Sequence, residues 1–336
     1  MSSFLFDILS VGTGAELTIR LACLLNERGH KVYYTDSSDS AFTSYLLQKG
    51  IGRVFYPDDF RWFQPDLVLL DRRLDDRGGF YRERNIRIVC LELRFGGKQT
   101  AIGEYPLLFL VPTPLDYRER SDEWLVCAGP LLDTDYEKMK EVSKREELLA
   151  GRLSRYKQQN VRLSLFVVAD VAEGMCPDLH FYEVVKDFCL QNPQYEVILC
   201  SDNKDCLNRL FPLPANMQFY LPGASRQLAM SGDLLVTNGD LDMLVSCIYH
   251  RLPVLLIPVT KVQVENATRM VYHGLGLQAT GRYSAAADFN NEIQSLLQHK
   301  EEITAKMDKM SELFDRKNEQ VHYVLNRLEE WAKRKE

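Results

Sequence analysis

A glycine-rich turn near the start of the chain contains residue types that can bind a ligand through the backbone. Gly12, Thr13 and Gly14 follow an apolar run and precede a helical pattern that begins at Ala15. Glycines let a backbone approach a ligand closely, and the N–H groups at a helix start attract anions. Glu16 is the nearest titratable side chain, and a buried carboxylate can accept a proton from a hydroxyl group. Glu16 is therefore the candidate general base, unless it only complements the helix dipole.

The same turn has two other interpretations. A dinucleotide site would place a glycine three residues after Gly14, where Leu17 stands, although Asp36 at the end of the next strand keeps NAD binding open. A tight turn between a strand and a helix, without any ligand, also fits these residues.

A second candidate turn joins an apolar strand to a helix in the second half of the chain. It contains Asn238, Gly239, Asp240 and, two residues later, Asp242. Two carboxylates at a helix start repel a diphosphate that the helix N–H groups would otherwise attract. Three interpretations stay open. Asp240 and Asp242 cap the helix themselves, a divalent cation bridges them to phosphate, or the ligand carries no diphosphate there.

An alternation of apolar strands and amphipathic helices positions both turns. Such alternation is typical of parallel βαβ units and predicts an α/β fold with two Rossmann-like, doubly wound parallel-sheet domains and a C-terminal helix. The expected strands lie at residues 6–11, 31–35, 66–70, 86–91, 107–111, 124–127, 163–169, 196–200, 217–221, 234–237 and 253–258. The expected helices lie at residues 15–27, 179–190, 204–210, 226–230, 243–249 and 264–273.

The alternation stops in a charged helical stretch and then starts again, which predicts the domain limits. We expect an N-terminal domain at residues 1–134, a helical connector at 135–160, a C-terminal domain at 161–300 and a C-terminal helix at 301–336. Apolar residues recur at helical spacing through this tail, so one face must be buried. The tail packs either on the sheet of the second domain or back on the first domain.

Two segments resemble the GT-B glycosyltransferase superfamily, particularly the GT1 and MurG-like enzymes and the nucleotide-sugar hydrolases of the pseudaminic-acid pathway. The opening GTGAELTIRLACLLNERGHKVYY is similar to the start of these proteins, and residues 219–276 match a longer ordered pattern. The positions that carry this second match are Pro222, Asp233, Gly239, Pro253, Pro258, Gln263, Asn266, Gly274 and Gly276.

The resemblance implies a ligand site between the two domains, flanked by the two turns. It implies donor contacts for a nucleotide sugar at Gly223, Asn238, Gly239, Asp240, Gln263 and Asn266. It also implies an acceptor-side loop at Gly12, Thr13 and Gly14 for a glycan or a small molecule. No cofactor is required by the sequence, and a metal is expected only if a divalent cation joins Asp240 and Asp242 to phosphate.

The chain departs from these families where they do their chemistry. Their loop histidine is replaced by Gly14 or Ala15, their Asp before Gln263 is Val262, and their helix Glu falls near Ser246. The resemblance therefore leaves alternatives open. The protein transfers a hexose or another sugar, hydrolyses a nucleotide sugar, or is a non-catalytic relative that binds a sugar nucleotide, a glycan or a partner protein.

Composition limits the partners and the cellular location. The net charge of −6 and the isoelectric point near 5.7 argue against nucleic acid, which needs clustered Lys and Arg. We expect no secretory signal, and the sequence has no apolar run long enough for a membrane span, while peripheral membrane contact stays open. Eight scattered cysteines without a CxxC pair are typical of reduced core residues, so a cytoplasmic protein is expected.

Overall fold

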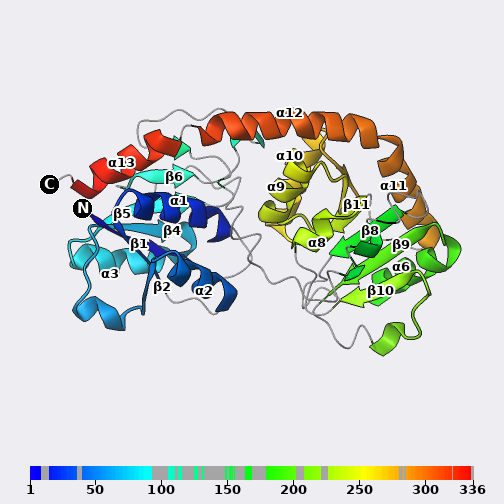
Figure 1. Cartoon of the computed structure of the whole chain (residues 1–336), viewed down its shortest axis with the longest axis horizontal. Helices are drawn as coiled ribbons and strands as arrows, with labels where there is room; N and C mark the ends of the chain where they lie inside the picture. Colours follow the sequence, from blue (N-terminus) through cyan, green and yellow to red (C-terminus); the bar gives the residue numbers. More distant parts are fainter. Residues whose placement is uncertain are drawn as a thin grey trace. The chain divides into compact units, whose positions relative to one another are not determined.

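The computed structural model describes most of the chain, and these residues form two compact units (Figure 1). The description covers residues 1–8, 15–35, 40–92, 105–109, 113–115, 125–127, 131, 148–149, 151–153, 155, 163–168, 179–201, 208–220, 226–279, 283, 285–319 and 321–333. The first unit contains Met1–Met139 and Glu312–Glu336, and the second contains Lys140–Ser311. Most of residues 135–160 lies outside the described residues, so the connector and the domain limits stay predictions.

The first unit is built on a parallel sheet with the strand order β3-β2-β1-β4-β5-β6-β7. Its strands are β1 (Ser3–Asp7), β2 (Lys31–Thr35), β3 (Gly52–Val54), β4 (Leu67–Asp71), β5 (Arg87–Glu92), β6 (Leu107–Phe109) and β7 (Leu125–Cys127). A short 3-10 helix, η3 (Thr113–Leu115), lies between β6 and β7.

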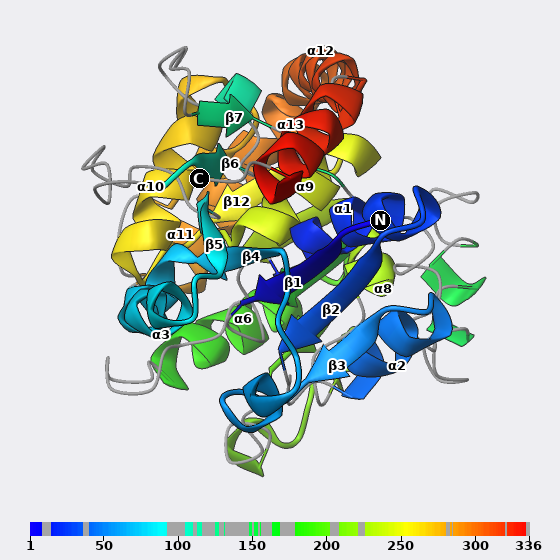
Figure 2. The same cartoon turned by 90° about the vertical axis from the view of Figure 1, so that its left-hand side faces the viewer.

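Both faces of this sheet are covered by apolar contacts. Phe4 and Phe6 of β1 belong to a core shared with α1 (Ala15–Glu27) and α2 (Ser40–Gln48). Leu5, which points to the other face, belongs to a core shared with η1 (Asp58–Arg61), η2 (Arg72–Arg77) and α3 (Gly78–Glu83). Figure 2 looks toward this unit, in which α1, α2 and α3 lie beside the strands. Burial on both faces explains why its strands read as continuous apolar runs.

The C-terminal helix α13 (Val321–Lys333) packs on the first unit, through the core that contains α1. Leu328 and other apolar residues of α13 are buried there, and Arg87 donates from Nη1 to the carbonyl oxygen of Ala332 over 2.5 Å. For α13, the structure therefore shows packing on the first domain rather than on the second sheet.

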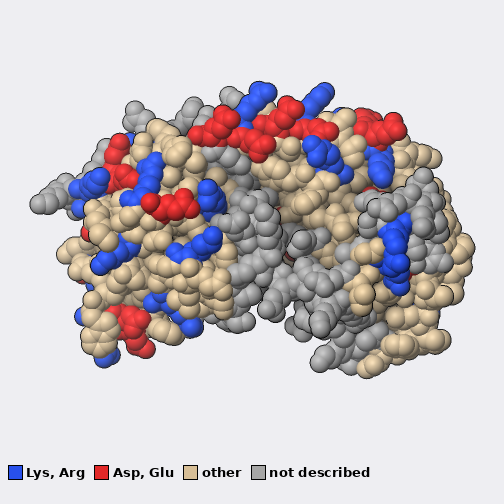
Figure 3. Space-filling view, in the orientation of Figure 1, with Lys and Arg blue, Asp and Glu red and all other residues tan. Residues whose placement is uncertain are grey.

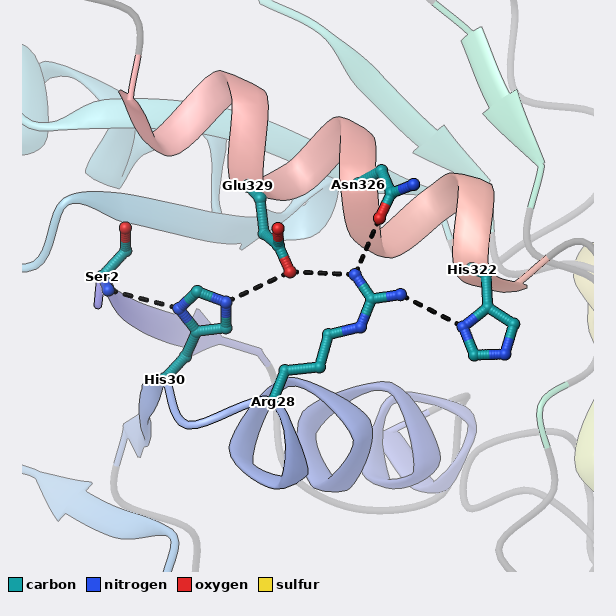
Figure 4. A network of polar contacts seen from close by, with 6 residues as sticks. All are labelled: Ser2, Arg28, His30, His322, Asn326 and Glu329. Atoms are coloured by element: carbon teal, nitrogen blue, oxygen red, sulfur yellow. Dashed lines mark hydrogen bonds and ion pairs between the residues drawn. The ribbon is translucent and has the colours of Figure 1, made fainter.

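A polar network next to this core joins the end of α1 to α13 (Figure 4). Arg28 Nη1 donates to Glu329 at 2.9 Å and to Asn326 at 2.8 Å, and Arg28 Nη2 lies 3.1 Å from Nδ1 of His322. His30 accepts from the Ser2 N–H at Nδ1, so its Nε2 is the nitrogen that donates to Glu329. The network ties α13 to the chain after α1 and to the start of β1.

The second unit is built on another parallel sheet, with the order β10-β9-β8-β11-β12-β13. Its strands are β8 (Leu163–Val168), β9 (Tyr195–Cys200), β10 (Met217–Tyr220), β11 (Leu234–Thr237), β12 (Val254–Leu256) and β13 (Leu277–Gln278). Its helices are α6 (Leu179–Gln191), α8 (Arg226–Met230), α9 (Leu241–His250), α10 (Lys261–Tyr272), α11 (Ala286–Gln298) and α12 (Lys300–Asn318), the last of which extends beyond Ser311 into the first unit.

The two parallel-sheet α/β domains expected from the sequence are confirmed, with corrections in detail. The strand expected at 6–11 is β1, which begins at Ser3 and ends at Asp7 because it pairs with β2 and β4 over that range. The short strands β3 and β13 and the helices α2, α3 and α11 were not expected. The tail forms two helices, α12 and α13, instead of one.

Side chains of both charge signs lie along α12 (Figure 3). Five cysteines with described side chains are buried and take part in no disulfide bond: Cys23, Cys90, Cys189, Cys200 and Cys247. Within the described ranges, every helix is too short or too polar to cross a bilayer.

Candidate functional site

The second candidate turn lies at the carboxyl end of β11. This strand lies next to β8, where the order in which the chain adds strands to the second sheet reverses. The chain winds outward from β8 to β9 and β10 on one side, and from β11 to β12 and β13 on the other. Ligands of open parallel sheets bind beyond the carboxyl ends of the strands at such a switch point. The turn from Asn238 to Asp240 therefore lies where this sheet is expected to bind a ligand.

Gly239 and Asn238 shape the turn. Gly239 has φ +97°, a conformation that strains any residue with a Cβ atom. Asn238 is only 5% exposed, and its Nδ2 donates to the carbonyl oxygen of Ile257 over 2.8 Å. The Asn238 side chain thus joins the turn to the end of β12, and a contact of this side chain with a donor stays a prediction.

The Asp240 carboxylate does not cap the N-terminus of α9. Asp240 occupies the N-cap position, but its side chain makes no capping hydrogen bond. Instead, its Oδ1 accepts from Nε2 of Gln263 over 3.1 Å. The interpretation in which Asp240 caps the helix through its own carboxylate is therefore wrong. The physical reason is competition from an amide donor on α10, which local capping preference does not include.

Gln263 is held in one orientation. Its Oε1 accepts from the backbone N–H groups of Val259 at 3.1 Å and Thr260 at 3.0 Å, while Thr260 caps α10 by accepting from the N–H of Gln263. Only the oxygen of the amide can accept from two N–H groups, so Nε2 must face Asp240. Gln263 thus completes the capping box of α10 and positions the Asp240 carboxylate.

The Asn266 side chain of α10 is hydrogen-bonded to the backbone of the turn. It is 3% exposed, and its Nδ2 donates to the carbonyl oxygen of Gly239 over 3.0 Å. Among the described residues, its buried Oδ1 has no hydrogen-bond partner. The contacts of Asn266 with Gly239 and of Gln263 with Asp240 bring five predicted donor-side residues into one cluster: Asn238, Gly239, Asp240, Gln263 and Asn266. Because the Asp240 carboxylate bonds to Gln263, it does not cap the first N–H groups of α9.

Most of the other predicted site residues lie outside the part of the chain that the structure describes. Gly12, Thr13, Gly14 and Gly223 lie outside the described residues, as does the side chain of Glu16, whose backbone belongs to the first turn of α1. Asp242 lies in the first turn of α9. Among the described side chains, no group of three or more His, Cys, Asp or Glu residues could hold a metal ion. The site between the two domains stays a prediction.

A second polar cluster, which the sequence interpretation missed, lies at the carboxyl edge of the first sheet. Asp7 ends β1 and is completely buried. Its Oδ1 accepts from Arg77 Nη1 over 2.7 Å, and its Oδ2 accepts from the Tyr81 hydroxyl over 2.6 Å. An aspartate inside an apolar strand is a signal for such a cluster, because a buried carboxylate needs partners. The partners themselves lie about 70 residues away and leave no local signal.

The surroundings shift the pKa values of this cluster. Burial raises the pKa of Asp7, while the bonds from Tyr81 and Arg77 act in the opposite direction. Burial and the neighbouring Asp7 raise the pKa of Tyr81, which keeps its hydroxyl protonated as a donor. The Arg77 guanidinium also covers the ring of Tyr56, at 4.2 Å from its centroid.

The whole chain is similar to solved glycosyltransferase structures. It matches the glycotransferase of kitacinnamycin with a TM-score of 0.77 and 13% identity, covering 98% of this chain and 99% of that chain. It matches CalG4, the calicheamicin glycosyltransferase, with a TM-score of 0.71 and 14% identity, covering 98% of each chain. It matches UGT71G1 of Medicago truncatula, solved with UDP-glucose, with a TM-score of 0.71 and 13% identity, covering 98% of each chain.

The protein has the GT-B glycosyltransferase fold. The resemblance inferred from residues 219–276 is confirmed at the level of this fold. No protein-family model and no curated protein sequence matches the chain. The GT-B fold gives a function only together with site residues, because one fold can host several activities.

Proposed function

We propose that this GT-B protein is a glycosyltransferase that binds a nucleotide sugar at the turn between β11 and α9. The carrying observation is that Gln263 holds the Asp240 carboxylate over 3.1 Å while this carboxylate makes no cap on α9. A diphosphate can then hydrogen-bond to the first N–H groups of the helix, where the dipole favours an anion. The fold likeness to glycosyltransferases, one of them solved with UDP-glucose, supports the same assignment.

In the proposed reaction, the oxygen of an acceptor hydroxyl forms a bond to the anomeric carbon of the donor sugar. The bond between that carbon and the phosphate oxygen breaks, and the nucleoside diphosphate leaves with the electron pair. The proton of the hydroxyl passes to a general base, for which Glu16 is our candidate. No cofactor enters this step, and a divalent cation at Asp240 and Asp242 is the alternative to be tested with EDTA.

A calorimetric screen tests the donor assignment. UDP, TDP, GDP, CMP and their sugars are titrated into the protein with Mg²⁺, with Mn²⁺ and with EDTA. We expect saturable binding of one class of nucleoside diphosphate, including binding in EDTA. If no member of the panel binds under any of these conditions, the proposed function is wrong.

A second candidate is a GT-B relative that binds a nucleotide sugar without transferring the sugar, or that hydrolyses it. The observation in its favour is that none of the six histidines lies in the segment from Gly12 to Glu16. Release of nucleoside diphosphate separates these functions. Release that requires an acceptor indicates a transferase, release in water alone indicates a hydrolase, and tight binding without release indicates a non-catalytic protein.

A further inference from the structure

Arg77 presents a guanidinium group that is oriented by the protein but only partly used by it. Its Nη1 donates to the buried Asp7, and its guanidinium carbon lies over the Tyr56 ring, 4.2 Å from the ring centroid. Within the described part of the chain, Nε and Nη2 of Arg77 donate to no protein atom. The side chain is 26% exposed. One edge of this guanidinium thus has no partner among the described residues, and such an edge matches the two oxygens of a carboxylate.

The place of Arg77 in the fold adds a second, independent argument. The first sheet winds outward from β1 to β2 and β3 on one side, and from β4 to β5, β6 and β7 on the other. Asp7 is the last residue of β1, and Arg77 ends η2, which directly follows β4. The pair therefore joins the carboxyl ends of the two strands at the switch point, where a parallel sheet binds its ligand.

Tyr56 contributes a second polar group next to the guanidinium. Its ring is half-buried against Phe60, Phe80 and Tyr81, which fixes its position. Within the described residues its hydroxyl has no protein hydrogen-bond partner. Burial, together with the charges of Asp7 and Asp76, raises the pKa of Tyr56, so its hydroxyl remains a hydrogen-bond donor at neutral pH.

We propose that Arg77 and the Tyr56 hydroxyl bind a carboxylate of the acceptor substrate, so that the acceptor of this protein is an organic acid. This assignment rests on the proposed function and names the acceptor class for it. Asp7 and Tyr81 are positioning residues, because they hold Arg77 through the buried carboxylate. A monoanion fits better than a phosphate dianion, because Asp7 already balances one positive charge and Asp76 adds a carboxylate near Tyr56.

The test is a titration followed on the Nε–H signals of arginine by nuclear magnetic resonance, with the full-length protein. Benzoate is the probe, because it is a monoanion whose ring can contact the aromatic side chains beside Arg77. Methyl benzoate is the uncharged match, and inorganic phosphate is the second anion. We expect benzoate to shift the Arg77 signal saturably, methyl benzoate to leave it unchanged, and phosphate to bind more weakly than benzoate.

Three variants assign the binding to this site. Arg77→Lys keeps a charge beside Asp7 but loses the planar edge, and we expect benzoate affinity to fall at least tenfold. Tyr56→Phe keeps the ring under Arg77 and removes only the hydroxyl, so it remains informative if Arg77→Lys fails to fold, and we expect an approximately fivefold loss. Arg327→Gln is the matched control, because Arg327 also pairs with a carboxylate, that of Glu330 at 2.9 Å, and covers an aromatic ring, that of Trp331 at 5.4 Å, and it should leave benzoate binding unchanged.

The proposal is overturned if the Arg77 signal does not respond to benzoate, if methyl benzoate shifts it equally, or if phosphate binds more tightly than benzoate. The outcome is separable from that of the proposed function. Benzoate binding at Arg77 without binding of any nucleotide sugar would refute the transferase and leave the anion site standing. Sugar transfer to uncharged acceptors that Arg77→Lys does not change would refute the acceptor class and leave the transferase standing.

Discussion

Replacement of Asp240 by Asn measures how strongly this carboxylate opposes a nucleoside diphosphate at α9. Asp240→Asn removes one negative charge but keeps a side-chain oxygen that can accept from Gln263 Nε2. In the wild-type protein this nitrogen lies 3.1 Å from Oδ1 of Asp240. Asn is also as well suited to an N-cap position as Asp. The turn and its contact with α10 are therefore expected to remain, so that only the charge changes.

The size of the effect follows from the geometry of a helix start. A diphosphate bonded to the first N–H groups of α9 would lie about one helical turn, roughly 6 Å, from the N-cap carboxylate. Because Asp240 is exposed, the effective dielectric constant is close to that of water. Two phosphate charges at about 6 Å are then repelled by about 1.4 kcal/mol, and about 0.15 M salt roughly halves this value. The Kd for UDP or TDP should fall about tenfold at low salt and about threefold at physiological salt.

The assay is calorimetric titration in EDTA, at low and at physiological salt, with wild type and Asp240→Asn. Asp187→Asn, which removes an exposed charge from α6, is the control and should not change the Kd. An unchanged Kd for Asp240→Asn would refute the electrostatic reasoning. Weaker binding by Asp240→Asn would show that the carboxylate contacts the ligand instead of opposing it.

Two further outcomes are expected. Gly239→Ala and Gly29→Ala both place a Cβ atom at positive φ, +97° and +84°, so each should destabilise its unit by about 1–2 kcal/mol, but only Gly239→Ala should weaken nucleotide binding in calorimetry. Equal losses of nucleotide affinity in both variants would show that the Gly239 turn is not part of the donor site. Burial alone raises the pKa of Glu329, but the bonds from Arg28 and His30 hold this pKa below its ordinary value of 4.5. A lowered pKa stabilises the docked helix above about pH 4.5 and loses this effect as the pH falls. Hydrogen exchange of α13 amides, corrected for intrinsic rates, should therefore be faster in Glu329→Gln than in wild type at pH 7 by an amount equivalent to about 0.5–1 kcal/mol, and this difference should disappear near pH 3. A difference that is equal at both pH values would contradict this ionic contribution.

Sequence reasoning left the contact of Asp240 open, and the structure excludes one of its alternatives, a cap on α9 by the Asp240 carboxylate. Capping preference is a local property, and Asp is among the best N-cap residues. The competing donor is Gln263, which is 23 residues away and reaches Asp240 only when α10 lies beside the turn. Its orientation depends in turn on the N–H groups of Val259 and Thr260. The sequence alone could not rank these alternatives, because their energies depend on distances between elements.

The sequence by itself determined the alternation of elements and hence the fold class. The ranges expected for α1, α8, β2 and β11 agree with the structure, because helical or strand periodicity and turn residues act over a few neighbours. Only the tertiary structure decided which short segments pair as β3 and β13, since strands of two or three residues carry no readable period. The docking of α13 and the pairing of Asp7 with Arg77 were also decided there. Both depend on contacts between residues far apart in the chain, which exist only after the sheets have brought them together.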